Sequence, residues 1–381
     1  MNLYQKYFAS FDGKLWLNAA SEGPLPLPAR KALEEAVEWK SKPYLLTNAK
    51  FAAVVVELKE SIGRLIGVKA QDVVLANSAS YGLHILANGL PWAAGDEILL
   101  MQNDFPTDIL PWLALEKRGV RVRQIKPKDK VICPEELLAN ISPHTKLFCI
   151  SHVHTFSGYV LEIEKFGEIC RKHGVIFAVN LSQSLGTRPV DISRFPVDAV
   201  VAAGYKWLCG PYGSGLAWFS PNLRDRIEYN QAYWIAALSP QELQSEEALN
   251  PPEIKGARKY DVFGTANFFN FVPFKAAIDL WLELGLDNVR AYHQQLIEQF
   301  VEGLDVKKYV LISPKKGNSR SSLVVISHRD GEKNEIIHRN LIDQQIYTAL
   351  WKGLIRIAPH AYNTSEDLER LNQLLGGFNE F

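Results

Sequence analysis

The 381-residue sequence has few cysteines, no net charge and no long hydrophobic run. Its four cysteines form no CxxC pair, which is typical of reduced thiols in a cytosol and argues against a disulfide framework. The 42 basic residues balance the 42 acidic ones, so no overall field attracts nucleic acid or an anionic membrane surface. This balance favours a small molecule as the partner.

No stretch approaches the roughly 18 uncharged apolar residues that a membrane span needs. Residues 1–18 contain no basic region followed by an apolar one and a small-residue cleavage site. We therefore expect a cytoplasmic protein without a membrane anchor. The length suits two domains, or one large α/β domain with a smaller partner.

Short runs rich in Val and Ile alternate with helical patterns between residues 50 and 220, which predicts an α/β fold with a mostly parallel sheet covered by helices on both faces. The seven expected strands lie at 72–77, 96–101, 120–125, 146–151, 175–180, 198–204 and 215–220. The polar stretch 239–255 reads as a long loop at a domain crossing, and the C-terminal part as a smaller α/β unit. We place the large domain at 17–265 and the small domain at 1–16 and 266–381.

A phosphate site is predicted at residues 73–86, which run from a strand through small polar residues into a helix. Free backbone N–H groups and the positive end of the helix dipole meet at such a point. The hydroxyls of Ser78 and Ser80 can add hydrogen bonds there, although one of them can equally serve only as the cap of the helix.

Lys206 follows a buried strand and precedes a loop rich in glycine and proline. A lysine is ordinarily a solvated surface residue, but apolar neighbours such as Trp207 argue for partial burial here. Burial lowers the pKa of an amine and makes it a nucleophile that can form an imine. At the end of a neighbouring strand, Asn180 and Gln183 could face a ring or merely close a turn.

Arg356 lies within an apolar strand near the C-terminus, where a guanidinium needs a partner. The carboxylate of an amino-acid substrate fits its fork of N–H donors. A structural ion pair with an Asp or Glu elsewhere explains it equally well.

Two further patterns favour structural roles. His152 and His154 face the same side of one strand, but no third ligand is recognisable, so we predict no metal site. Gly210, Gly213 and Gly215 follow the lysine instead of opening a helix, so a dinucleotide-binding loop is not expected.

In this order, the segments resemble the class V aminotransferase group of fold-type I enzymes, which depend on pyridoxal 5'-phosphate (PLP). The group includes cysteine desulfurases, kynureninase, isopenicillin N epimerase-like proteins and C–S lyases. The resemblance runs from LWLNAASEGPLP (15–26) to LIRIAPHAYNTSEDL (354–368), and it is most specific at residues 151–175 and 180–215.

The resemblance implies roles for particular side chains. Lys206 would hold PLP as a Schiff base, and Gln183 would bond the ring hydroxyl. Ala79 and Ser80 would hold the phosphate, with Tyr205 reaching it as well.

The remaining implied roles concern the ring face, the substrate and a second subunit. Phe105 would lie over the pyridine face, and Asn18 and Arg356 would bind the substrate. Thr265 would reach the phosphate of the neighbouring subunit, which implies a homodimer with shared sites.

The sequence departs from the group at four places. Asn180 stands where members of the group have an Asp that keeps the pyridine nitrogen protonated. An amide cannot stabilise that positive charge as a carboxylate does, so the cofactor should be a weaker electron sink. Asn180→Asp should therefore raise transamination. Thr155 stands where many members have an Asn near the ring, and Ala203 replaces a phosphate-binding Ser. Residues 317–325 and 348–357 contain no cysteine, so desulfuration through a persulfide is not expected.

The sequence therefore predicts a PLP enzyme that acts at the α-carbon of a small amino acid, of the aminotransferase or epimerase type. Two alternatives stay open. One is a C–S lyase that acts on cysteine or cystine by β-elimination. The other is a protein that binds PLP without turnover, which Asn180 suggests and the pair of Lys206 and Arg356 opposes.

Overall fold

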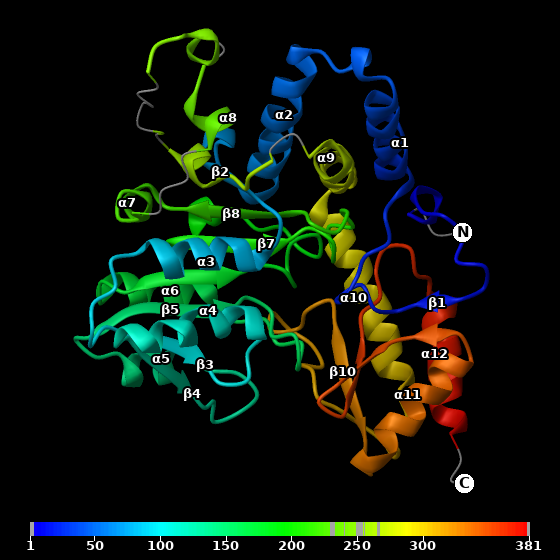
Figure 1. Cartoon of the computed structure of the whole chain (residues 1–381). Helices are drawn as coiled ribbons and strands as arrows, with labels where there is room; N and C mark the ends of the chain where they lie inside the picture. The colour runs from blue at the N-terminus through cyan, green and yellow to red at the C-terminus, as the bar shows by residue number, and fades with distance from the viewer. Residues whose placement is uncertain are drawn as a thin grey trace.

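The computed structural model describes residues 4–228, 233–239, 241–248, 254, 256–264 and 267–378 (Figure 1). Its largest sheet has seven strands in the order β2-β8-β7-β6-β5-β3-β4. They are β2 (Val73–Ala76), β3 (Glu97–Met101), β4 (Arg121–Ile125), β5 (Thr145–Ser151), β6 (Ile176–Asn180), β7 (Ala199–Ala203) and β8 (Gly215–Phe219). Only β8 runs antiparallel to its neighbours. The predicted strands and the mostly parallel sheet are confirmed.

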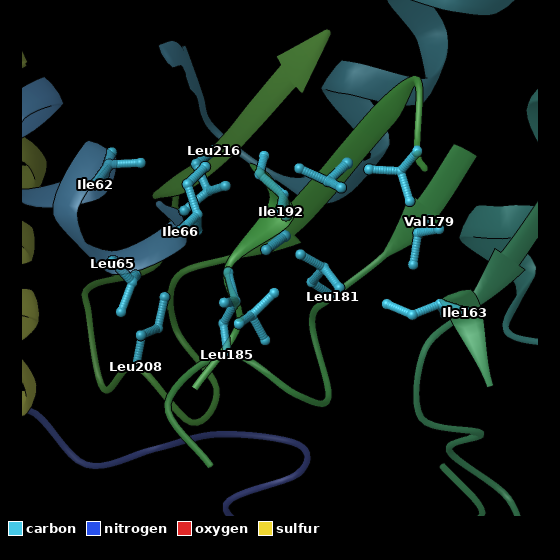
Figure 2. Packing of buried hydrophobic residues seen from close by; sticks show 14 of the residues in the cluster. Ile62, Leu65, Ile66, Ile163, Val179, Leu181, Leu185, Ile192, Leu208 and Leu216 are labelled. Carbon is cyan, nitrogen blue, oxygen red and sulfur yellow. The ribbon is translucent and has the colours of Figure 1, made fainter. Parts of the chain in front are cut away.

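Helices cover both faces of this sheet. Successive side chains of a strand point to opposite faces, and strands such as β2, β3, β6 and β7 are buried at every position, so both faces are apolar. The helices packed on one face are α2 (Asn48–Ile66), α5 (Pro134–Asn140), α6 (Ile163–Lys172) and α9 (Phe268–Leu284). Figure 2 shows part of this cluster, including Ile66 of α2, Val179 of β6 and Leu216 of β8. The other face is covered by α3 (Ala79–Gly89), α4 (Leu110–Leu113) and α7 (Pro221–Arg224).

The C-terminal part forms the predicted smaller α/β unit. Its four-stranded antiparallel sheet has the order β12-β13-β10-β9. The strands are β9 (Tyr309–Leu311), β10 (Val324–His328), β12 (Ala349–Trp351) and β13 (Leu354–Ile357). Its helices are α10 (Leu286–Gly303), α11 (Asn334–Asp343) and α12 (Ser365–Gly377), of which α10 continues from α9 and lies along α12 (Figure 1).

The N-terminal segment joins this smaller unit. Strand β1 (Leu15–Trp16) pairs in parallel with β11 (Ile346–Tyr347), and the next residues bring Asn18 beside Ala358. Residues 15 and 16 thus pair with the smaller unit, whereas Tyr4 and Phe8 pack in the core cluster of the large sheet. The predicted division into 17–265 and 1–16 with 266–381 stays a prediction. Thr265 and part of the polar stretch 239–255 lie outside the described residues.

The remaining helical segments surround these units. Helix α1 (Leu27–Ser41) packs on α9, and α8 (Trp234–Ala237) is a single turn. Short 3₁₀ helices are η1 (Gln5–Tyr7), η2 (Pro43–Leu45), η3 (Ala70–Asp72), η4 (Pro106–Asp108), η5 (Ala114–Arg118), η6 (Ile192–Arg194), η7 (Glu242–Gln244), η8 (Ala257–Tyr260) and η9 (Gly331–Lys333). Within the described ranges, no helix has the length and the hydropathy that crossing a membrane requires.

Candidate active site

The predicted site residues gather where the central parallel strands end. Ser151 and Asn180 are the last residues of β5 and β6, and Lys206 follows β7. Neighbouring parallel strands end at one edge of a sheet, which is where ligands bind in open α/β folds. Arg356 reaches the same place from β13 of the smaller unit, because it bonds to Thr155 just beyond β5.

Lys206 is a buried amine with no ion-pair partner among the described residues. Its Nζ lies 4.9 Å from the centre of the Phe105 ring. Burial, and next the positive charge of Arg356, lower the pKa of Lys206 to about 8, while the carboxyl of Asp108 opposes this shift. The amine is therefore far more nucleophilic at neutral pH than an ordinary lysine.

Close backbone packing holds the lysine loop in place. The N–H of Gly23 donates to the carbonyl of Tyr205 at 2.9 Å. A Cβ on Gly23 would lie 2.0 Å from the carbonyl oxygen of Lys206, so only glycine allows the N-terminal segment to approach this closely. The position of Lys206 thus depends on a residue far away in the sequence.

Arg356 is buried and its hydrogen-bond partners are all neutral. Its Nη1 donates to the hydroxyl of Thr155 at 2.8 Å, and its Nη2 donates to Ser21 Oγ at 2.6 Å and Asn18 Oδ1 at 3.3 Å. Its Nε has no partner, and no carboxylate of the described chain forms an ion pair with it. The structural ion pair considered from the sequence is therefore not found within the described residues. Ser21 is a partner that the sequence did not reveal.

Within the described part of the chain, the charge of Arg356 is consequently not paired with a carboxylate. Burial lowers its pKa to about 10, which still leaves it protonated at neutral pH. A buried charge without a counterion is costly. A carboxylate ligand would supply the missing anion together with an acceptor for the free N–H.

Gln183 is oriented by three hydrogen bonds and does more than close a turn. The indole N–H of Trp207 donates to its Oε1 at 2.7 Å, and its Nε2 donates to the carbonyl of Ala20 at 2.9 Å and to Thr155 Oγ1 at 3.2 Å. Thr155 thus accepts from both Gln183 and Arg356 and keeps its own hydroxyl proton for a third group. This hydroxyl links the predicted ring site to the predicted substrate site.

Asn180 contacts a buried carboxyl that the sequence reading missed. Its Nδ2 lies 2.9 and 3.2 Å from the two carboxyl oxygens of Asp108, and its Oδ1 accepts the N–H of Ser182 at 3.0 Å. The Ser151 hydroxyl donates to Asp108 Oδ2 at 2.8 Å. Asp108 is the last residue of η4, in the same segment as Phe105.

The phosphate end of the predicted site is built around the start of α3. Ser78 is the helix cap, since its Oγ accepts the N–H of Tyr81 at 3.2 Å while donating to Asn77 at 2.9 Å. The first N–H groups of α3, including those of Ala79 and Ser80, have no acceptor within the helix itself. Ser80 Oγ lies 3.2 Å from the hydroxyl of Thr107, another residue that the sequence did not suggest.

The other predicted phosphate contacts remain predictions. The ring of Tyr205 is half-buried and lies 5.0 Å from that of Tyr212. Thr265 is outside the described residues.

Neither His152 nor His154 is part of a cluster of metal-ligating side chains among the described residues. Both ring nitrogens of His154 are in hydrogen bonds, to Ser157 at 2.7 Å and to the carbonyl of Asn103 at 3.0 Å. Burial, and then Arg188, lower the pKa of His152 to about 3, so it stays neutral. In the part of the chain that the structure describes, no three His, Cys, Asp or Glu side chains are grouped to hold a metal ion.

The described residues fit PLP on grounds of chemistry. PLP brings an aldehyde, a phosphate and a ring with a basic nitrogen, and an amino acid brings a carboxylate. The site offers a nucleophilic amine in Lys206, a helix start with free N–H groups, a buried carboxyl system at Asn180 and Asp108, and an uncompensated cation in Arg356.

Comparison with known proteins identifies the family. The family model described as "Aminotransferase class-V" matches residues 41–371. The chain therefore belongs to the class V aminotransferase family, a family of fold-type I PLP enzymes. The resemblance seen in the sequence is confirmed.

Relatives with different activities align along almost the whole chain. A probable cysteine desulfurase of Methanothermobacter thermautotrophicus is 24% identical over 385 residues, which cover 95% of this chain and 94% of the relative. The isopenicillin N epimerase of Streptomyces clavuligerus is 26% identical over 381 residues, which cover 94% and 93%.

A solved structure shares the fold over the full length. The complex of the cystine C–S lyase C-DES with its reaction product, cysteine persulfide, superposes with a TM-score of 0.86 and 21% identity. The match covers 97% of this chain and 99% of that one. The predicted α/β architecture with its smaller C-terminal domain is thus confirmed.

Proposed function

We propose that this chain is a PLP enzyme that acts at the α-carbon of a small amino acid. Lys206 would hold the cofactor and Arg356 the substrate carboxylate. The observation that carries the proposal is the environment of Arg356: a buried guanidinium with neutral partners and a free Nε, close enough to a buried amine to lower its pKa. A protein that only stores PLP has no need of this cation.

Each residue would have a distinct task. When bound, PLP supplies an electron sink that stabilises negative charge at the α-carbon. Arg356 would fix the carboxylate and so decide which bond of the α-carbon is weakened. Lys206, with a pKa of about 8, can accept and return a proton near neutral pH. Phe105 would present the apolar face of its ring beside the amine of Lys206.

Three reaction types suit these tasks: transamination, epimerisation and β-elimination. The first two are the types that the sequence suggested, and the S. clavuligerus relative is an epimerase by name. A C–S lyase is the second candidate, supported by the full-length similarity to C-DES. Desulfuration through a protein persulfide is disfavoured because residues 317–325 and 348–357 contain no cysteine. Three of the four cysteines, Cys149, Cys170 and Cys209, are also buried, and burial raises their pKa, whereas Cys133 is exposed.

The products of a panel of amino acids separate these types. We expect the purified protein to show a visible absorbance band with PLP, and this band should shift with cysteine, cystine, alanine or glutamate. Pyruvate with sulfide or persulfide indicates elimination, a keto acid without sulfur release indicates transamination, and the inverted amino acid indicates epimerisation. A band that shifts with none of a wide panel would favour the protein that binds PLP without turnover.

The lowered pKa of Lys206 predicts the pH dependence of cofactor capture. Only the neutral amine attacks an aldehyde, and the neutral fraction at pH 7 is roughly a tenth for a pKa near 8, against less than a thousandth for an ordinary lysine. We expect the rate of covalent PLP capture by the apo-protein to rise with pH up to about 8 and then level off. Stopped-flow absorbance measures this rate. A rate that still rises steeply at pH 10 would show that the amine has the pKa of an ordinary lysine.

A further inference from the structure

Asp108 is a buried carboxyl that forms no ion pair among the described residues. It has no exposed surface, and it accepts three hydrogen bonds: one at each oxygen from the amide of Asn180, and one from the hydroxyl of Ser151. No Lys, Arg or His of the described ranges forms an ion pair with it. Burial, and then the nearby Asp104, raise its pKa to about 8. At neutral pH the carboxyl is therefore largely protonated, and it would ionise when a further positive charge is brought close to it.

We propose that Asp108, acting through Asn180, supplies the negative charge that keeps the pyridine nitrogen of PLP protonated in this protein. The inference rests on the proposed function, since it concerns the same site and cofactor. It makes Asp108 a positioning residue and assigns the missing carboxylate to a residue 72 positions earlier in the sequence.

The contacts of Asn180 determine which way its amide points. A backbone N–H can only donate a hydrogen bond, so Oδ1 must face Ser182 and Nδ2 is left to donate to Asp108. The oxygen keeps a second lone pair. An amide oxygen can accept from a protonated ring nitrogen, whereas it offers nothing to an unprotonated one.

The carboxyl behind the amide strengthens this preference. A negative charge that draws on the N–H groups of an amide polarises it and makes its oxygen a better acceptor, and such effects are larger in a buried network. The coupling is reciprocal: a protonated ring nitrogen would bring a positive charge close to Asp108 and hold its carboxyl in the ionised form. Asn180 alone would leave the ring a weak electron sink, but Asn180 with Asp108 does not.

The structure also changes the expected result of Asn180→Asp. From the sequence alone, this substitution should raise transamination by restoring the carboxylate. With Asp108 at 2.9 Å, however, it would place two buried carboxyls in contact, and one of them would have to bind a proton. The exchange Asp108→Asn with Asn180→Asp avoids this pair and restores one carboxylate at the neighbouring position.

The test is the protonation state of the ring nitrogen, read by nitrogen NMR of protein loaded with isotopically labelled PLP. We expect a protonated nitrogen in the wild type and an unprotonated one in Asp108→Asn, with PLP bound about tenfold more weakly, or about 1.4 kcal/mol. The double exchange should return the protonated signal and the affinity. Asp104→Asn is the matched control: Asp104 is also buried, but it bonds to backbone N–H groups and not to Asn180, so the signal should stay that of the wild type.

The outcomes separate this proposal from the proposed function. A wild-type protein without any covalent PLP band overturns both. Two outcomes overturn only the role of Asp108 and leave the proposed function standing, provided that the PLP band is normal. One is an unprotonated ring nitrogen in the wild type, and the other is a protonated ring nitrogen in Asp108→Asn. Melting of the apo-proteins tests folding: Asp108→Asn should unfold at the same or a higher temperature, since it removes a buried carboxyl without a counterion. If that variant fails to fold, the signal of the double exchange decides, because an unprotonated nitrogen there would contradict the proposal.

Discussion

Lys206→Ala should abolish the visible absorbance band that PLP gives with the wild-type protein, and turnover should fall by about 10⁴-fold. The amine is the one that burial and Arg356 make nucleophilic, and alanine offers neither a covalent bond nor a proton carrier. Absorbance after gel filtration with PLP measures the first effect, and product formation measures the second.

Lys352 supplies the control for this result. It lies on the hairpin that leads to Arg356, 3.9 Å from the centre of the Phe156 ring, and its Nζ bonds to the side chain of Asn103. Burial lowers its pKa as well. Lys352→Ala should therefore keep the band. If the band survives in Lys206→Ala and disappears in Lys352→Ala, then Lys352 holds PLP and the assignment of Lys206 is wrong.

Arg356→Gln should lower kcat/KM for amino acids by about 10²- to 10³-fold while leaving the PLP band in place. The variant keeps a hydrogen-bonding side chain but removes the charge that would pair with the substrate carboxylate. Titration of the band with alanine and with ethylamine, which lacks a carboxylate, measures the loss: the wild type should prefer alanine strongly, and the variant should not.

Arg188→Gln is the matched control for Arg356→Gln. Arg188 is likewise buried, with a pKa lowered by burial to about 10, but its Nη2 donates to the backbone carbonyl of Arg320 at 3.1 Å instead of to Thr155. This variant should still discriminate alanine from ethylamine. Equal loss of discrimination in both variants would indicate general damage to the fold and would count against a specific role of Arg356.

The fold could be predicted because its signals are local. Each strand of the large sheet is a short apolar run that is buried on both faces, as in Val73–Ala76 and Ala199–Ala203, and such runs are recognisable without any partner. Lys206 and Asn180 could be found in the same way, since they stand directly at strand ends. The pairing of β1 with β11 was not predicted, because two-residue strands carry no periodic pattern.

The polar network around the site could not be predicted in this manner. Asp108 sits in a three-residue 3₁₀ helix, and an Asp in such a turn is ordinarily exposed. It is buried against Asn180 and Ser151, at contacts that only the folded sheet creates. Ser21 is hidden for the same reason, because its bond to Arg356 joins residues 335 positions apart. The one available clue was that Asp108 follows Phe105, a residue already assigned to the ring.

The bonds of Arg356 to Asn18 and Ser21 connect the two ends of the chain, across 338 and 335 positions. During synthesis, the stretch from Ser78 to Lys206 leaves the ribosome well before Arg356 has been made. Copies that are released early therefore lack the guanidinium and also leave Asn18 and Ser21 without it. If Arg356 binds the substrate as proposed, recognition of an amino acid requires the N-terminal and C-terminal segments together.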